Sequence, residues 1–428
     1  MLLFKKFDPS LFLFVAALTT ACHTTEIRAQ NEVDDLGDVE SKSDLVSFLE
    51  EGKLNLNARF RYEYADIDGF DESNAFTLRT RLGYTTKRFE GFQAMIEFED
   101  MRSADEDQYN AAGLNGQPGR SVIADPVDTE LNQLWVDYDF RSLDGDLPIT
   151  ARLGRQRMIF DDARFIGNVG WRQLEQTMDA VKLTATPIEG FQTTYAYIDE
   201  VNRIFGPDSG RDFNSDSHLV NVSYAGLEIG KIVGFAYLLD LGASGASVSS
   251  QTYGLRLDGN TDLNDELAIG YIGSVAFQSD YSENATNYDA LYFLLESKLK
   301  FKQANSFFGG GVEVLGSDDG VIAFSTPLAT GHKFNGFADS FLATPAQGLR
   351  DYYLMAGFDV PDHELSFAAY YHYFTGDDTA VELGTEIDLV MSKKLHDNVK
   401  LVMKYAYYDG DAGRADIHRF WLQIDLSY

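Results

Sequence analysis

Four arginines stand at alternate positions in two segments of the chain: Arg59 and Arg61, then Arg79 and Arg81. A guanidinium group stays charged at any physiological pH, and its planar fork pairs with both oxygens of a carboxylate. Residues two apart in an extended chain point to the same face, so each pair presents its two guanidinium groups together. The pattern therefore predicts a surface suited to carboxylate-bearing ligands.

Arg152 and Lys182 occupy equivalent positions in later segments, and six more cations share them: Arg256, Lys298, Lys300, Lys400, Lys404 and Arg419. Carboxylates fall on the same polar faces: Glu63, Glu97, Glu99, Asp137, Asp139 and Asp425. Two interpretations stay open. The cations bind an anionic ligand, or they pair with these carboxylates and brace the wall that carries them, since charge removed from bulk water is normally paired.

The irregular segment from Met158 to Gln176 adds Arg164, Trp171 and Arg172 to the candidate binding residues. If this loop folds inward, its two arginines add positive charge and the indole ring stacks on a sugar face. The alternative is a loop that only caps the fold, with Trp171 as its anchor.

Two further candidates, Arg155 and Arg157, precede this loop and share the parity of the apolar Leu153. A β-bulge is needed to turn them to the polar face.

Other chemistry is not supported by the spacing of the residues. The run that begins at Gly242 lacks the G-x-S-x-G spacing of a nucleophile elbow. The acidic run from Asp66 to Glu72 has Thr77 where a calcium loop needs its twelfth-position glutamate. The seven histidines are scattered, with no pair at ligand spacing. We expect no catalytic residues, no metal, no cofactor and no enzymatic activity.

The elements that position these residues are β-strands. From Leu54 to Tyr64 the even-numbered residues are apolar or aromatic and the odd-numbered ones are mostly polar, which is the period of a strand with one apolar face. Eighteen such runs are predicted: 53–64, 76–84, 91–101, 130–141, 149–156, 177–186, 190–199, 217–225, 231–240, 250–259, 265–279, 286–302, 305–316, 348–359, 364–375, 383–392, 398–409 and 416–428.

The connections between these runs alternate between short and long. Short turns include 187–190 and 360–363, whereas long loops include 102–129, 157–176, 200–216 and 317–347. Transmembrane β-barrels have this alternation and an even number of strands. The last run, with alternating apolar residues and a terminal Tyr428, is typical of the signal that the bacterial barrel-insertion machinery reads. The sequence predicts an all-β, eighteen-stranded antiparallel outer-membrane barrel of the porin type over residues 53–428.

The N-terminus predicts export. Lys5 and Lys6 precede an apolar run from Leu11 to Leu18 that is too short for a membrane span, which needs about 20 residues. We expect a signal peptide over 1–29, cleaved after Ala29, with lipoprotein processing at Cys22 as the alternative. Residues 30–52 then form an acidic periplasmic leader with one short helix over 43–51.

The formal charge of −32 and the pI of about 4.4 exclude nucleic acid as a partner. The acids either keep outer loops solvated or bridge to lipopolysaccharide through divalent cations. Outer-membrane lipid, lipopolysaccharide and the barrel-insertion machinery are the expected partners, besides an anionic oligo- or polysaccharide.

Several stretches resemble the alginate-export family of outer-membrane proteins, most clearly within residues 50–206. They are 56–64, 77–84, 154–157, 161–173, 176–180, 195–197 and 201–206. The resemblance implies a monomeric barrel whose lumen conducts an anionic polyuronate. The expected function is passive or facilitated passage of such saccharides in the outer membrane of a Gram-negative bacterium. A general diffusion porin and a structural or adhesion barrel with acidic outer loops are the alternatives.

Overall fold

The computed structural model describes residues 48–49, 51–142 and 148–428. The predicted signal peptide, the processing at Ala29 or Cys22, and nearly all of the leader over 30–52 lie outside these residues. Strand structure begins at Lys53, and the unit Lys53–Tyr428 is described here by itself. None of the helices within the described ranges is long and apolar enough to cross a membrane.

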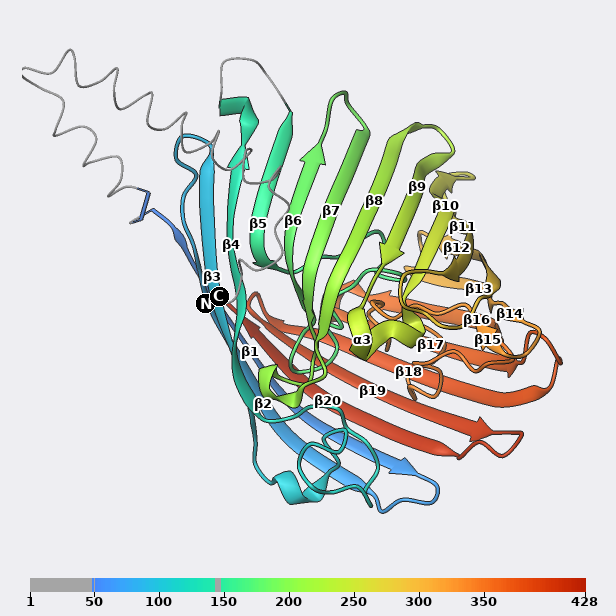
Figure 1. Cartoon of the computed structure of the whole chain (residues 1–428). Coiled ribbons are helices and arrows are strands. Elements are labelled where there is room, and N and C mark those ends of the chain that lie inside the picture. Colours follow the sequence, from blue (N-terminus) through green and yellow to red (C-terminus); the bar gives the residue numbers. More distant parts are fainter. Residues whose placement is uncertain (1–47, 50, 143–147) are drawn as a thin grey trace, which may run out of the picture. The chain divides into compact units, whose positions relative to one another are not determined.

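Nearly all of this unit is built from strands (Figure 1). The strands are β1 (Lys53–Ile67), β2 (Ser73–Thr85), β3 (Phe92–Ser103), β4 (Asp128–Asp139), β5 (Ile149–Gln156), β6 (Thr177–Ala185), β7 (Phe191–Asn202), β8 (Phe213–Leu227), β9 (Gly230–Leu239), β10 (Ser250–Asp262), β11 (Leu267–Asp280), β12 (Asp289–Phe301), β13 (Ser306–Leu315), β14 (Ser317–Asp318), β15 (Ile322–Ala323), β16 (Leu349–Val360), β17 (Leu365–Thr375), β18 (Glu382–His396), β19 (Val399–Gly410) and β20 (Ile417–Ser427). Short helical turns join some of them: η1 (Glu106–Gln108), η2 (Phe140–Ser142), η3 (Pro207–Ser209), α3 (Gly242–Gly245), η4 (Ala246–Val248) and η5 (Pro361–His363).

Eighteen of these strands form one antiparallel sheet that closes on itself. Each strand pairs with the next along the chain, β13 pairs with β16, and β20 pairs with β1. The short strands β14 and β15 pair only with each other, inside the connection between β13 and β16. The predicted eighteen-stranded antiparallel barrel is therefore confirmed, although several strands extend beyond the predicted runs.

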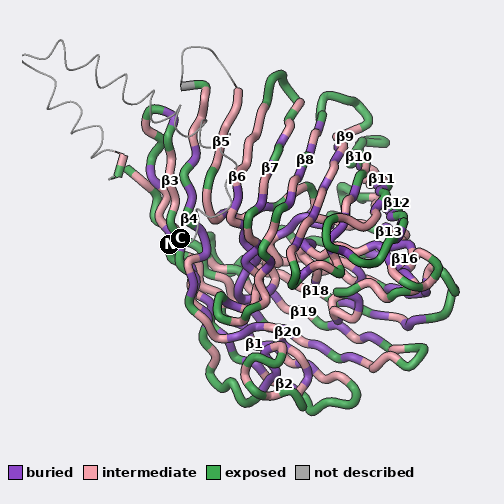
Figure 2. The backbone as a smooth tube through the Cα atoms, in the orientation of Figure 1, coloured by how far each residue is buried: buried purple, intermediate pink, exposed green. Residues whose placement is uncertain are grey.

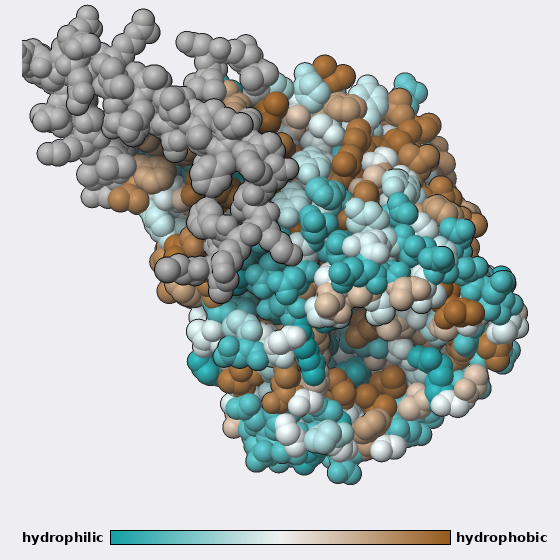
Figure 3. All heavy atoms as spheres, in the orientation of Figure 1, coloured by the Kyte–Doolittle hydropathy of each residue, from teal (hydrophilic) through white to brown (hydrophobic). Residues whose placement is uncertain are grey.

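The two faces of the wall follow the predicted alternation. On β1 and β2 the apolar side chains of Phe60, Phe76 and Leu82 are each about half exposed, whereas Arg61 and Arg79 are buried. Figure 2 shows buried and more exposed residues alternating along the strands, and Figure 3 shows hydrophobic side chains gathered over the outer face of β8 to β10. The apolar face is the outer wall, and the polar face lines the interior.

Candidate functional site

Two long connections fold into the interior of the barrel. The first inner loop comprises residues 157–176 and the second inner loop comprises residues 316–348. They pair with each other through a parallel bridge between Ile166 and Leu328, and the Gly167 amide donates to the Leu328 carbonyl at 2.8 Å. Both bridge residues are almost fully buried. Of the two alternatives for the segment from Met158 to Gln176, inward folding is the one that the structure shows.

The first inner loop follows the inner wall over more than half of the barrel's circumference. Its side chains meet wall residues of β10, β13, β1 and β2 in turn, through the ion pairs Asp162–Arg256, Arg164–Glu313, Arg172–Glu63 and Glu175–Arg81. Each of these wall residues points inward, because each is at most 9% exposed. The loop is consequently fixed at several points of the circumference.

Two of the predicted pore arginines hold this loop by its backbone. Arg59 donates from Nη1 to the Gly170 carbonyl at 3.0 Å and from Nε to Asp425 at 2.9 Å. Arg61 donates from Nη2 to the Trp171 carbonyl at 2.5 Å and from Nε to Gln423 at 2.9 Å. These contacts correspond to the bracing interpretation.

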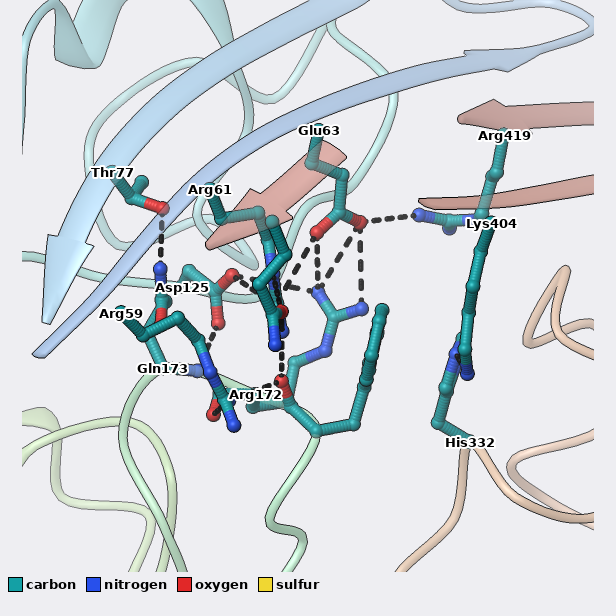
Figure 4. Close-up of polar contacts among 12 residues, drawn as sticks. Arg59, Arg61, Glu63, Thr77, Asp125, Arg172, Gln173, His332, Lys404 and Arg419 are labelled. Carbon is teal, nitrogen blue, oxygen red and sulfur yellow. Dashed lines mark hydrogen bonds and ion pairs between the residues drawn. The ribbon is translucent and has the colours of Figure 1, made fainter. Parts of the chain in front are cut away.

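Arg172 lies among three buried carboxylates. Its guanidinium is 3.4 Å from Glu63 and 3.8 Å from Asp125 (Figure 4), and it is 3.6 Å from Asp339. Burial alone lowers the pKa of Arg172, but the three carboxylates raise it above its ordinary value, so the group stays charged. Asp125 also accepts the backbone amide of Gln173 at 2.8 Å, which ties a third inward segment to the loop.

Trp171 is packed against side chains of the protein. The His332 ring stacks on it at 4.6 Å between centroids, and the charged groups of Arg61 and Lys404 lie 4.3 Å and 3.9 Å from its ring centre. The ring also meets Trp421 edge-on at 5.9 Å. The expected stacking of Trp171 on a sugar face is not supported, because these groups already cover the ring.

His332 joins the two inner loops as a neutral imidazole. Burial, with Lys404 nearby, lowers the pKa of His332 to about 3. Its Nδ1 lies 2.9 Å from Asp339 and its Nε2 lies 3.0 Å from the Lys404 ammonium. Nδ1 therefore carries the proton and donates to Asp339, while Nε2 accepts from Lys404.

Arg81 and Arg157 are neutralised by glutamates. Arg81 donates to Glu99 at 2.7 Å, and Arg157 ion-pairs with Glu175. Burial alone would raise the pKa of Glu175, but the two arginines lower it to about 2. Arg157 keeps 33% of its side-chain surface exposed and reaches the inward-facing Glu97 at 3.6 Å, so it lies in the lumen.

Arg79 differs from its neighbours. It contacts Asn57, and its Nε and Nη1 atoms are buried without a hydrogen-bond partner among the described residues. It also lies directly opposite Arg59 in the sheet. Like charges in this arrangement repel each other.

Partly exposed lumenal cations lie on the wall between β3 and β6, and the exposed Lys300 and Lys400 have the same inward parity on β12 and β19. Arg152 ion-pairs with Asp137 at 2.8 Å, lies 3.5 Å over the Trp135 ring, and has a quarter of its side chain exposed. Arg88, from the turn before β3, binds the same carboxylate at 2.5 Å. Lys182 lies opposite Arg152 in the ladder and makes no hydrogen bond or ion pair with the described part of the chain.

The predicted inward position of Arg155 is wrong. Arg155 pairs across the ladder with Leu134, which is 48% exposed on the outer face, and ion-pairs with Asp179 at 2.8 Å. The sheet does contain a bulge nearby, but it falls in β4, where the register shifts opposite Glu97 and Phe98. Because β5 has no shifted register, Arg155 keeps the parity of Leu153.

The wall formed by β13 and β16 to β18 carries buried acids that the sequence analysis did not select. Glu386 accepts the Ala338 amide at 2.6 Å, and Asp388 accepts the Phe337 amide at 3.0 Å. Gly336 has a φ of +86°, and a Cβ there would collide with the Glu386 carboxylate. The inward parity of both acids within β18 was visible in the sequence, but their loop partners were not.

Arg164 joins this acidic wall. It donates to Glu313 at 2.6 Å and to Asn335 at 3.0 Å, while Asn335 in turn donates to Asp351 at 3.2 Å. Asp351 accepts from His372 at 2.9 Å. Arg164 is therefore a structural link between the two inner loops and the wall. The described residues contain no group of three or more His, Cys, Asp or Glu arranged to hold a metal ion.

Comparison with known proteins agrees with this architecture. A family model described as alginate export matches residues 51–295. No curated protein matches the sequence. Acinetobacter baumannii OccAB2 has a similar structure, with a TM-score of 0.70 and 16% identity over 89% of this chain and 99% of that one. Pseudomonas aeruginosa OpdK, solved with vanillate, has a TM-score of 0.68 and 13% identity over 89% of this chain and 99% of that one.

The closed barrel, its apolar outer wall and its charged interior are those of a channel in the outer membrane of a Gram-negative bacterium. The family match covers more than half of the sequence, including both strands that carry the first arginines and the whole first inner loop. The predicted family and location are confirmed, and the chain belongs to the alginate export family.

Proposed function

We propose that this channel passes anionic saccharides of the polyuronate type, guided by the cations on the wall between β3 and β6. The observation that carries the proposal is that cationic side chains outnumber carboxylates around Asp137. Arg88 and Arg152 share one carboxylate, that of Asp137, while the neighbouring Lys182 pairs with none of the described carboxylates, and Arg152 and Lys182 face the lumen. Guanidinium and ammonium groups in a pore wall favour anions and pair with carboxylates.

Three of the first four arginines have a structural role in this proposal. Arg59 and Arg61 position the first inner loop, and Arg81 is paired with Glu99. They shape the constriction, while the cations nearer the periplasmic mouth contact the solute. The protein acts as a monomer without catalysis. The solved structure of OpdK with vanillate, a carboxylate, is consistent with passage of carboxylates through this fold.

Single-channel conductance in planar bilayers tests the proposal. The wild type is expected to prefer anions and to be blocked by oligouronate. The double variant Arg152→Gln/Lys182→Gln should shift the reversal potential toward cations and weaken the block about tenfold for each lost charged contact. The control Arg102→Gln/Lys393→Gln removes the same charge from the outward face of the wall and should change neither measurement.

The other outcomes separate the alternatives. Equal selectivity and equal block in the wild type and in the Arg152→Gln/Lys182→Gln variant would overturn the proposal in favour of a general diffusion porin. Absence of conductance in a folded wild type would indicate a structural barrel.

A further inference from the structure

The outer wall carries a hollow of about 540 Å³ that crosses the strands from β13 to β20. Its floor includes Ala356 and Ala369, which are direct partners on β16 and β17. Larger side chains surround this pair, including Phe358, Phe367 and Leu389. Two small residues side by side among large ones leave a depression in an otherwise filled surface.

This hollow faces lipid. Ala369 pairs with Leu389, which is 47% exposed on the outer face, and Phe358 is 48% exposed. The lining side chains on this face are apolar apart from the Tyr405 hydroxyl and Ser306. In a bilayer the only abundant material that fills an apolar depression of this kind is hydrocarbon.

The hollow lies toward the periplasmic side of the barrel. Phe358 and Phe367 lie close to the short turn η5, and Met391 lies near the turn that follows β18. Short turns of such barrels face the periplasm. The acyl chains available at this depth belong to phospholipids of the periplasmic leaflet.

A lysine lies between the hollow and the periplasmic boundary of the membrane. Lys393 pairs across the sheet with Leu365 and Leu401, so it shares the outer face with Met391. It makes no hydrogen bond or ion pair with the residues that the structure describes. The adjacent Lys394 is different, because its ammonium binds Asp397 at 2.7 Å and lies 3.8 Å from Glu364. Of these two lysines, Lys393 is therefore the one available to bind a group outside the protein.

We infer that this surface binds one anionic phospholipid of the periplasmic leaflet, with its phosphate at Lys393 and an acyl chain in the hollow over Ala356 and Ala369. A lysine stem lies along apolar surface while its ammonium reaches the headgroup level. Apolar contact and charge then act on the same molecule, which makes the site selective for anionic headgroups.

Native mass spectrometry of the purified full-length protein with added phosphatidylglycerol tests this inference. The wild type should retain one lipid through detergent activation. Lys393→Gln should weaken retention about fivefold, as expected for one lysine near an anionic headgroup. Ala356→Phe fills the hollow and should abolish retention, whereas Lys394→Gln should match the wild type.

Two comparisons make the result decisive. Phosphatidylethanolamine should bind the wild type more weakly than phosphatidylglycerol, and equally with it in Lys393→Gln. Ala356→Phe must still show the heat-dependent gel shift of a folded barrel, and Ala369→Phe provides a second filled variant. Equal retention in the wild type and in folded Ala356→Phe, or preference for lipid A over phosphatidylglycerol, would overturn the inference.

Discussion

On the β1–β2 side of the lumen the strands supply the cations and the first inner loop supplies the acceptors. Arg59 and Arg61 donate to backbone carbonyls of that loop. On the β18 side the roles are reversed, because Glu386 and Asp388 accept backbone amides of the second inner loop. The β1–β2 wall thus pairs with backbone carbonyl groups of the first inner loop, and the β18 wall pairs with backbone amide groups of the second. The loop groups lie where no sheet ladder can pair them, so wall charges replace that ladder.

The two walls also differ in what remains accessible. Glu386 and Asp388 on β18 are buried, whereas Arg152 on the wall between β3 and β6 keeps a quarter of its side chain exposed. A charge that anchors a loop is therefore separate from a charge that meets a solute. This division predicts which substitutions change stability and which change transport.

The largest effect is expected for Arg61→Met. The substitution removes the contact with the Trp171 carbonyl and leaves the buried carboxylates of Glu63 and Asp125 with one partner fewer. Breaking a buried charge network of this kind costs about 3–5 kcal/mol. The free energy of unfolding in detergent micelles measures it. Arg102→Met, at an exposed pair with Asp100, should cost at most about 1 kcal/mol.

The opposite wall should respond to Glu386→Ala. Loss of the acceptor leaves the Ala338 amide unsatisfied in a buried position, which costs about 1–3 kcal/mol. Glu386→Gln keeps an acceptor oxygen and should cost less. Hydrogen exchange of the second inner loop reports the change locally. Equal exchange rates in the alanine and glutamine variants would contradict an anchoring role.

His332 gives a smaller effect that depends on pH. Its pKa is lowered to about 3 in the folded protein, so below its ordinary pKa of 6.5 the unfolded chain binds a proton that the folded chain does not. Stability from this group is present above pH 6.5 and falls by up to about 1.4 kcal/mol for each pH unit below it. Thermal unfolding of the wild type and His332→Gln between pH 7.5 and 5.5 should show a shallower pH dependence in the variant.

The smallest effect is expected for Arg79→Gln. Arg79 has no carboxylate partner within the described residues and lies opposite Arg59, so its removal relieves desolvation and repulsion. The free energy of unfolding should stay within about 1 kcal/mol of the wild type. Arg81→Gln, two residues away, breaks the pairs with Glu99 and Glu175 and should cost clearly more. A larger loss in the free energy of unfolding of Arg79→Gln would contradict this and show that Arg79 stabilises the barrel wall.

The fold followed from the sequence because one rule governs most of it. Each inward Arg59 or Arg61 is flanked by outward apolar residues, and a transmembrane wall enforces this alternation over the whole strand. The rule also holds at Arg155, and the exception predicted there is wrong, because β5 keeps its register and the bulge belongs to the neighbouring strand. A β-bulge depends on how two strands pair, so the sequence of one strand alone does not predict it.

The site was less predictable than the wall. Parity placed Arg152 and Lys182 inward, but it could not show that Arg59 and Arg61 would be occupied by loop carbonyls. The contact of Trp171 with His332 joins residues 161 positions apart, and neither loop has a repeating pattern that would indicate it. Long-range contacts between irregular segments depend on the closed barrel that surrounds them.

The junction between the first and last strands has a consequence for biogenesis. Arg59 binds Asp425 and Arg61 binds Gln423 across this junction, and the same two arginines hold the first inner loop. Trp171 also contacts Trp421 on β20. Arg59 and Arg61 make all of these contacts only when the C-terminal strand β20 has paired with the N-terminal strand β1. Maturation of the narrow passage is thereby coupled to the final step of membrane assembly, so an unsealed intermediate would hold this loop less firmly than the finished channel.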